Sequence, residues 1–203
     1  MDWSILHALN DFLYRHDAVE DPLRFYVNAS EALFIATLAV VFLLANGARN
    51  VVWRRAAVAA TLSAALALGV GKVISELVDR ARPFVIDSGG VHLFSGHAAD
   101  PGFPSDHATA SFAIATAIFL RHRRWGLVAL TAAAVLSVGR VALGIHFPSD
   151  VLAGAALGAA AALVLWEARP LRRGVDGLSD WLGRGWEWAL ARGASLVGLS
   201  WRP

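Results

Sequence analysis

The chain has 203 residues, 57% of them hydrophobic, and a net charge of only +2. This apolar content exceeds that of ordinary soluble domains and is typical of membrane proteins. The absence of cysteine excludes disulfide bonds and thiolate metal sites.

The first segment, residues 3–14, places its apolar side chains on one helical face. A helix of this length extends about 18 Å, whereas the hydrocarbon core of a bilayer is roughly 30 Å thick. We therefore expect this helix to lie along the membrane surface instead of crossing it.

Five apolar stretches follow, and crossing a bilayer takes roughly 20 residues. They cover residues 27–46, 55–78, 106–120, 125–145 and 149–167. The last contains small residues that let helices approach closely, namely Gly154, Ala155, Gly158 and Ala159. The predicted fold class is therefore all-α, an integral membrane helical bundle of about five transmembrane helices with interfacial helices at both termini.

The end of the chain, residues 176–201, carries four tryptophans among glycines and arginines: Trp181, Trp186, Trp188 and Trp201. We interpret it as an amphipathic helix at the membrane interface; a frayed tail that adheres to lipid is the alternative. The predicted division is a membrane-embedded domain, residues 1–173, and a cytoplasmic interfacial tail, residues 174–203.

Arginine clusters predict the orientation, because positive residues favour the cytoplasmic side. Three clusters alternate with the spans so that all fall on one side: Arg49, Arg54 and Arg55, then Arg121, Arg123 and Arg124, then Arg169, Arg172 and Arg173. The loops carrying Arg82, His107 and His146 are then predicted to face the outside.

The first polar loop motif is GFPSDHAT, residues 102–109, at the start of the third span. Ser105 is suited to cap this helix, whose first turn offers unpaired N–H groups to an anion. His107 in that turn is placed to donate a proton. A plain helix cap beside an interfacial histidine fits the same pattern.

The second motif is GRVALGIHFPSD, residues 139–150, between the last two spans. The four-residue step from His146 to Asp150 allows the carboxylate to accept the imidazole N–H, which leaves the other ring nitrogen free as a nucleophile. A purely structural hydrogen bond and a metal site are the alternatives, but further well-placed metal ligands are lacking.

The third motif ends the second span with Arg82 before a proline, and arginine presents a planar fork to phosphate oxygens. Arg80 either does the same or faces solvent. Lys72, the single lysine, lies about 15 Å from Arg82 along a helix. It either contacts phosphate or, as we favour, pairs with Glu76 four residues on.

These three motifs together resemble the type-2 phosphatidic acid phosphatase superfamily, which includes vanadium haloperoxidases. Arg140, His146 and Asp150 complete its third motif, and Arg82-Pro83 matches the end of its first. Asp106 stands where the second motif usually has glycine. Ser75 stands where the first usually has lysine, and Lys72 is one turn further away.

Within the superfamily, the chain looks most like bacterial undecaprenyl-diphosphate phosphatases, through FPSDHAT, RPF, the histidine-bearing loop with His97, and Glu31 in the first span. The resemblance implies His146 as nucleophile, Asp150 as its orienting group and His107 as acid and later base. Phosphate would be held by Arg82, Arg140, the Ser105 backbone and Lys72. Asp106, Glu31, Arg80 and His97 would support the site, Asp106 either by tuning His107 or by selecting diphosphates.

The resemblance further implies a metal-independent reaction without cofactors, in the inner membrane of a bacterium with the site facing the periplasm. The partners expected are a polyprenyl diphosphate and the bilayer, and no nucleic acid; the oligomeric state is left open. The alternatives are another lipid phosphatase (for phosphatidylglycerophosphate, phosphatidate or lipid A), a lipid phosphotransferase, and a transporter or scaffold that uses the charged residues within its spans.

Overall fold

The computed structural model describes residues 1–45 and 50–196. Every regular element in these two ranges is a helix, which confirms the all-α fold class. The helices are α1 (Asp2–Tyr14), α2 (Asp17–Leu44), α3 (Val51–Val78), α4 (Pro83–Ile86), α5 (Asp106–Arg121), α6 (Arg123–Ala142), α7 (Pro148–Glu167) and α8 (Arg169–Leu196).

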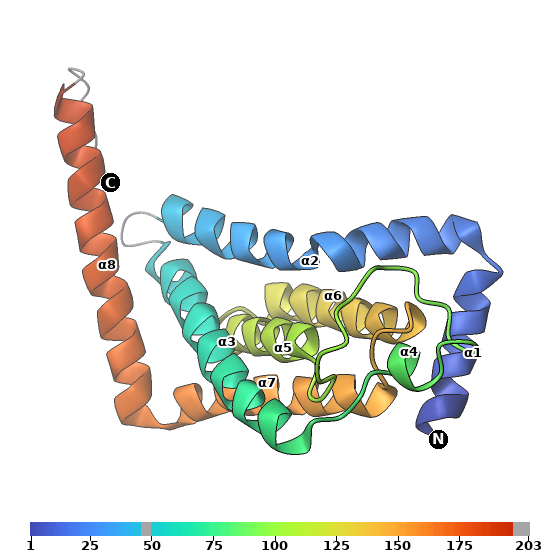
Figure 1. The fold of residues 1–203 in the computed structure, drawn as a ribbon. Coiled ribbons are helices and arrows are strands. Elements are labelled where there is room, and N and C mark those ends of the chain that lie inside the picture. Colours follow the sequence, from blue (N-terminus) through green and yellow to red (C-terminus); the bar gives the residue numbers. More distant parts are fainter. Residues whose placement is uncertain (46–49, 197–203) are drawn as a thin grey trace.

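Five of these helices form a bundle whose centre is α5. Helices α2, α5, α6 and α7 run lengthwise and α3 crosses them obliquely (Figure 1). Helix α5 packs against α3, α6 and α7 through a core that consists mostly of alanine. The small residues of α7 serve this packing, because Gly154 and Gly158 lie directly against the backbone of α5.

Four stretches are long and apolar enough to cross a membrane: α2, α3 together with α4, α6 and α7. The remaining predicted span, α5, has 16 residues and is about 24 Å long, which is shorter than the hydrocarbon core. Because α3, α6 and α7 pack around its sides, α5 lies inside the bundle and can be shorter than its neighbours.

Helix α2 begins ten residues before the predicted span, at Asp17 rather than residue 27. Its extra turns are polar and are held by ion pairs from Arg24 to Glu20 (2.8 Å) and to Asp21 (2.9 Å). The apolar pattern therefore marked the membrane-spanning part of this helix and not its first turns.

Helix α1 crosses the end of the bundle near α4 (Figure 1). Its buried Asn10 donates hydrogen bonds to the carbonyls of His92 and Ala142 and accepts one from the His92 N–H, each 2.8 Å long. Tyr14 stacks on the His92 ring at 3.8 Å between centroids. Helix α1 thus holds the long loop between α4 and α5 against the end of α6.

Helix α8 crosses the opposite end of the bundle (Figure 1). Its acidic residues pair with arginines of α3 and α5: Glu187 with Arg54 (2.9 Å), Asp180 with Arg55 (2.6 Å) and Asp176 with Arg121 (2.5 Å). The segment is therefore a docked helix and not a frayed tail. It begins at Arg169, so the predicted boundary at residue 174 falls inside it, and Trp201 lies outside the described residues.

The described arginines of the three clusters gather at the α8 end, because α3 and α6 begin there and α5 and α7 end there (Figure 1). Arg49 lies outside the described residues. The loops that carry Arg82, His107 and His146 lie at the opposite end, beside α1. The sequence therefore separated the two ends of the bundle correctly.

Candidate active site

His146 lies in the short connection between α6 and α7 and is almost completely buried, with 2% of its surface exposed. Its Nδ1 is 3.0 Å from the Gly102 carbonyl, and its Nε2 is 3.1 Å from Nη1 of Arg82 and 3.4 Å from Nη2 of Arg140. A carbonyl only accepts and a guanidinium only donates. The hydrogen-bond network thus assigns the proton to Nδ1 and leaves a lone pair on Nε2, between the two arginines.

The local sequence explains how the chain reaches this position. Gly144 has a positive φ of 77°, and a Cβ there would lie 2.7 Å from the His92 carbonyl, so the turn after α6 favours glycine. The N–H groups of Ile145 and His146 both donate to the Arg140 carbonyl. This tight turn brings the histidine back toward the arginine that precedes it by six residues.

Arg82 and Arg140 are both buried, with 5% and 4% of their surfaces exposed. Nε of Arg82 donates to the side chain and the carbonyl of Asp100, each at 3.0 Å, which fixes the guanidinium with its Nη atoms toward His146. In Arg140, Nη2 lies 3.1 Å from Nε2 of His97, while the buried Nε has no hydrogen-bond partner among the described residues. An unpaired buried donor beside a second arginine suits a bound anion.

His97 and Asp100 complete this cluster from the loop between α4 and α5. Burial, opposed by the hydrogen bond between His97 and the Ala98 carbonyl and reinforced by the charges of Arg82 and Arg140, lowers the pKa of His97. Its neutral Nε2 can therefore accept from Arg140. Burial alone raises the pKa of Asp100, but its hydrogen bond and ion pair with Arg82 more than offset this and bring the pKa below its usual value.

The same forces keep His146 neutral. Burial, and after it the positive charges of Arg140 and Arg82, hold the pKa of His146 well below its ordinary value of 6.5. A neutral imidazole with a free lone pair is the form that acts as a nucleophile. The surroundings therefore favour the reactive form of His146 at neutral pH.

His107 lies in the first turn of α5, where N–H groups lack partners within the helix and the helix dipole is positive. The positive charges of Arg140 and Arg82 act on its ring, and His146 and His97 are also among its neighbours. The structure thus brings His107 to the same cluster as His146. An anion held by the two arginines would also face the start of α5.

Ser105 differs from its predicted role. Its backbone N–H, expected to face phosphate, donates to the Asp150 carbonyl at 3.1 Å, and its side chain does not cap α5. Its buried Oγ has no hydrogen-bond partner in the described part of the chain. The hydroxyl, not the backbone N–H, is the group of Ser105 that is left to bind a ligand.

Asp150 also differs from expectation, because the predicted hydrogen bond to His146 is not formed. Its Oδ2 is 3.7 Å from Nδ1 of His146 and instead accepts the Phe147 N–H at 2.8 Å. Its Oδ1 accepts from Arg80 at 2.7 Å. The Gly102 carbonyl takes the place predicted for the carboxylate. Asp150 instead holds the Phe147 N–H and so fixes the start of α7, directly after His146.

Arg80 neither faces solvent nor reaches the two-arginine cluster. It donates to Ser149, Asp150 and Asp2, at 2.6, 2.7 and 3.0 Å, and its guanidinium lies 4.4 Å from the centre of the Phe147 ring. Asp2 also accepts the N–H and hydroxyl of Ser149. These contacts join the start of α1 to the start of α7, close to His146 in the sequence.

Three other candidates lie apart from the cluster. Lys72 is exposed and pairs with Glu76 at 3.5 Å, which confirms the pairing that the sequence favoured over phosphate contact. Glu31 is exposed on α2. Asp106 is exposed at the start of α5, near enough for the charges of Arg82 and Lys72 to act on it. Its role stays a prediction.

Sequence reasoning missed Gly102, Asp100, Asp2 and Asn10 as supports of the site. The local sequence contained one signal, since Asn10 is a polar residue on the apolar face of α1. Among the described residues, no group of three or more His, Cys, Asp or Glu side chains is arranged to hold a metal ion. The set that the structure does bring together can bind an anion and present a nucleophilic imidazole to it.

Comparison with known proteins adds independent findings. The model of the PAP2 superfamily matches residues 56–173. The chain is 36% identical over 152 residues to a protein of Escherichia coli named "Putative undecaprenyl-diphosphatase YbjG", covering 68% of this chain and 74% of the relative. It is 37% identical over 92 residues to a lipid A 1-phosphatase of Rhizobium etli, covering 44% of this chain and 40% of the relative.

Among solved structures, the fold is similar to that of LpxE from Aquifex aeolicus, with a TM-score of 0.64. The match covers 82% of this chain and 94% of the other at 20% sequence identity. At this identity the similarity concerns the fold alone.

Proposed function

Because the chain belongs to the PAP2 superfamily, we propose that it is a membrane phosphatase that removes the terminal phosphate of a polyprenyl diphosphate through a phosphohistidine intermediate. The observation that carries this proposal is the position of Nε2 of His146, between the guanidinium groups of Arg82 and Arg140. A phosphoryl group held by these two arginines would lie in line with the lone pair of that nitrogen.

In the first step, Nε2 of His146 attacks the terminal phosphorus, and the bond from phosphorus to the bridging oxygen breaks. His107 gives its proton to that oxygen, so the lipid leaves as a monophosphate. Nδ1 of His146 keeps its proton, which the Gly102 carbonyl accepts at 3.0 Å. Arg82, Arg140 and the start of α5 stabilise the negative charge on the phosphoryl oxygens.

In the second step, a water molecule gives a proton to His107 and attacks the phosphohistidine. The bond between phosphorus and nitrogen breaks, and inorganic phosphate leaves. Asp150 lies 3.7 Å from His146 and holds the Phe147 N–H, so it acts on the histidine by fixing the turn that carries it. The scheme uses no metal ion.

The substrate class is supported by the relative named an undecaprenyl-diphosphatase, to which this chain is similar over most of its length. The similarity to the lipid A 1-phosphatase covers less than half of either chain. Hydrolysis of lipid A is therefore the second candidate. Transfer of the phosphoryl group to another lipid would use the same first step.

The arginine-rich end of the bundle supports an orientation with α8 in the cytoplasm, because positive residues favour that side. The site at the other end would then face the outside, or the periplasm in a bacterium with two membranes. Release of phosphate on that side would produce a lipid monophosphate, which could then be used again as a carrier for cell-wall synthesis.

The test is phosphate release from a panel of undecaprenyl diphosphate, phosphatidylglycerophosphate, phosphatidate and lipid A by the purified protein. We expect the highest kcat/KM with undecaprenyl diphosphate. We expect loss of activity in His146→Ala and near-normal activity in His16→Ala, a control on an exposed histidine outside the site. Preference for a monophosphate or for lipid A would overturn the substrate proposal, and full activity of His146→Ala would overturn the mechanism.

A further inference from the structure

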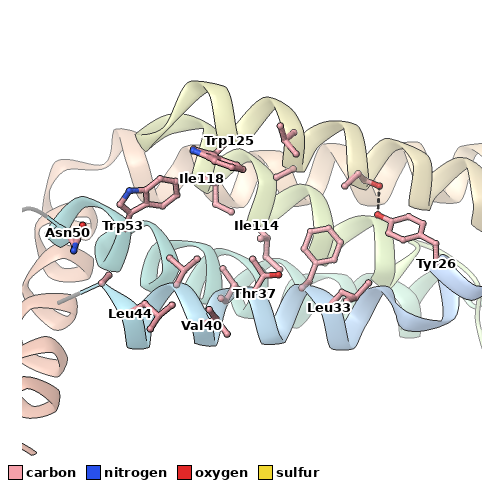
Figure 2. A pocket seen from close by; sticks show the side chains of 17 residues that line it. Tyr26, Leu33, Thr37, Val40, Leu44, Asn50, Trp53, Ile114, Ile118 and Trp125 are labelled. Carbon is pink, nitrogen blue, oxygen red and sulfur yellow. Dashed lines mark hydrogen bonds between the residues drawn. The ribbon is translucent and has the colours of Figure 1, made fainter. Parts of the chain in front are cut away.

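An elongated apolar groove of about 600 Å³ lies away from the candidate active site, between α2, α3, α5 and α6 (Figure 2). Its volume lies within the range of pockets that hold small ligands. The residues that line it come almost entirely from the membrane-spanning parts of these helices. The mechanism proposed above does not use this groove.

The walls are mostly apolar, although Tyr26, Thr37 and Asn50 also line them. Tyr26 contributes its ring, because its hydroxyl already donates to the Ala132 carbonyl at 2.8 Å, as Figure 2 shows. Trp53 and Trp125 stand at the opposite end, and Trp53 stacks on His122 at 3.8 Å between centroids. The groove therefore suits a hydrocarbon chain, and aromatic rings line its far end.

The residues of α6 that line the groove show how far it lies from Arg140 along the helix axis. Ala132 precedes Arg140 by eight residues, and Trp125 precedes it by fifteen. At 1.5 Å per residue, the groove therefore begins about 12 Å and ends about 22 Å from the level of Arg140. Half of the hydrocarbon core is about 15 Å, so the groove continues beyond the middle of the bilayer.

We propose that this groove holds the part of the substrate's polyprenyl chain that follows its first two isoprene units. The acyl chains of a phospholipid or of lipid A end near the bilayer midplane, so with their phosphate at the site they would reach only the upper part of the groove. A polyprenyl chain of many isoprene units is long enough to continue to Trp53 and Trp125. This inference rests on the proposed function and explains how chain length would be recognised.

The first test fills the groove on one wall. Ala129 is a groove residue of α6, and Ala134 on the same helix is exposed but does not line the groove. We expect Ala129→Trp to lower kcat/KM for undecaprenyl diphosphate about tenfold or more. Hydrolysis of geranyl diphosphate, whose two isoprene units end above the groove, should be unchanged. Ala134→Trp should affect neither substrate.

An unchanged kcat/KM of Ala129→Trp for undecaprenyl diphosphate would overturn the groove assignment, and so would an equal loss with both substrates. If the wild-type protein hydrolyses neither diphosphate, the proposed function fails, and a binding measurement still decides the question of the groove.

That measurement uses undecaprenyl phosphate with a photoreactive diazirine on the fourth isoprene unit from the phosphate, in nanodiscs of phospholipid. We expect crosslinks to α2 between residues 33 and 45 and to α6 between residues 125 and 132, and fewer of them in Ala129→Trp. Crosslinks spread over other faces of the bundle would overturn the inference. Equal suppression by added phospholipid would assign the groove to bulk lipid, and crosslinks between two copies would assign it to self-association.

Discussion

Close packing of α7 on α5 predicts that Gly158→Ala destabilises the protein. A Cβ at residue 158 would lie 2.2 Å from the carbonyl oxygen of Thr109 and 2.7 Å from the N–H nitrogen of Ala113. Both are backbone atoms of α5, and ordinary contact begins near 3.4 Å. The two helices would have to separate by about 1 Å, and overpacking of this kind costs about 1–3 kcal/mol.

For a chain of this size that loss corresponds to a fall in melting temperature on the order of 2–12 °C. The assay is thermal unfolding of the detergent-solubilised protein, followed by circular dichroism. The matched control is Gly69→Ala in α3, where an added Cβ meets nothing within 4 Å. There we expect unchanged stability or a gain of up to about 1 kcal/mol. Equal melting temperatures for Gly158→Ala and Gly69→Ala would refute the packing argument.

Three further predictions concern the site. Asp2→Asn removes the carboxylate charge that binds Arg80 and Ser149. Because these groups are partly exposed, we expect the free energy of unfolding to fall by only about 0.5–1.5 kcal/mol, and kcat to fall as well. The pKa of His146 is lowered, so its nucleophilic form persists below pH 6.5 and is lost only as the pH falls through the lower value. The acid limb of the pH profile of kcat/KM should therefore lie below pH 6.5, and it should move to higher pH in Arg140→Gln, which removes a positive charge beside His146. An acid limb that stays in place in this variant would count against His146 as the titrating group. Phosphate release should persist in excess EDTA, and its loss, with recovery on adding a divalent cation, would contradict a mechanism that uses only side chains.

The sequence predicted the helices well where the apolar pattern is long. The ends of α3, α6 and α7 lie within about four residues of the predicted spans, as is usual for such boundaries. The polar start of α2 was missed because its first turns are outside the apolar stretch. The docking of α8 could not be derived from local pattern, although Asp176 and Asp180 are spaced four residues apart and so share one helical face.

The candidate site was predicted in its residues more than in its contacts. Arg82, His107, Arg140 and His146 gather as expected, because motif spacing places them at the helix ends and loops of one end of the bundle. The acceptor for His146 was misassigned, since Asp150 is the neighbour in sequence whereas Gly102 is 44 residues away. Contacts between residues so far apart in the sequence depend on how the helices pack, and the spacing of residues within one motif does not predict this packing.

His146 is the nucleophile of the proposed mechanism, and trapping the covalent intermediate tests this role most directly. The protein would be mixed with undecaprenyl diphosphate carrying a labelled terminal phosphate, quenched within one turnover, and digested for mass spectrometry under alkaline conditions that preserve phosphohistidine. We predict label on His146 in the wild-type protein and none in His146→Ala. Label on a different side chain, or rapid turnover by His146→Ala, would contradict the account.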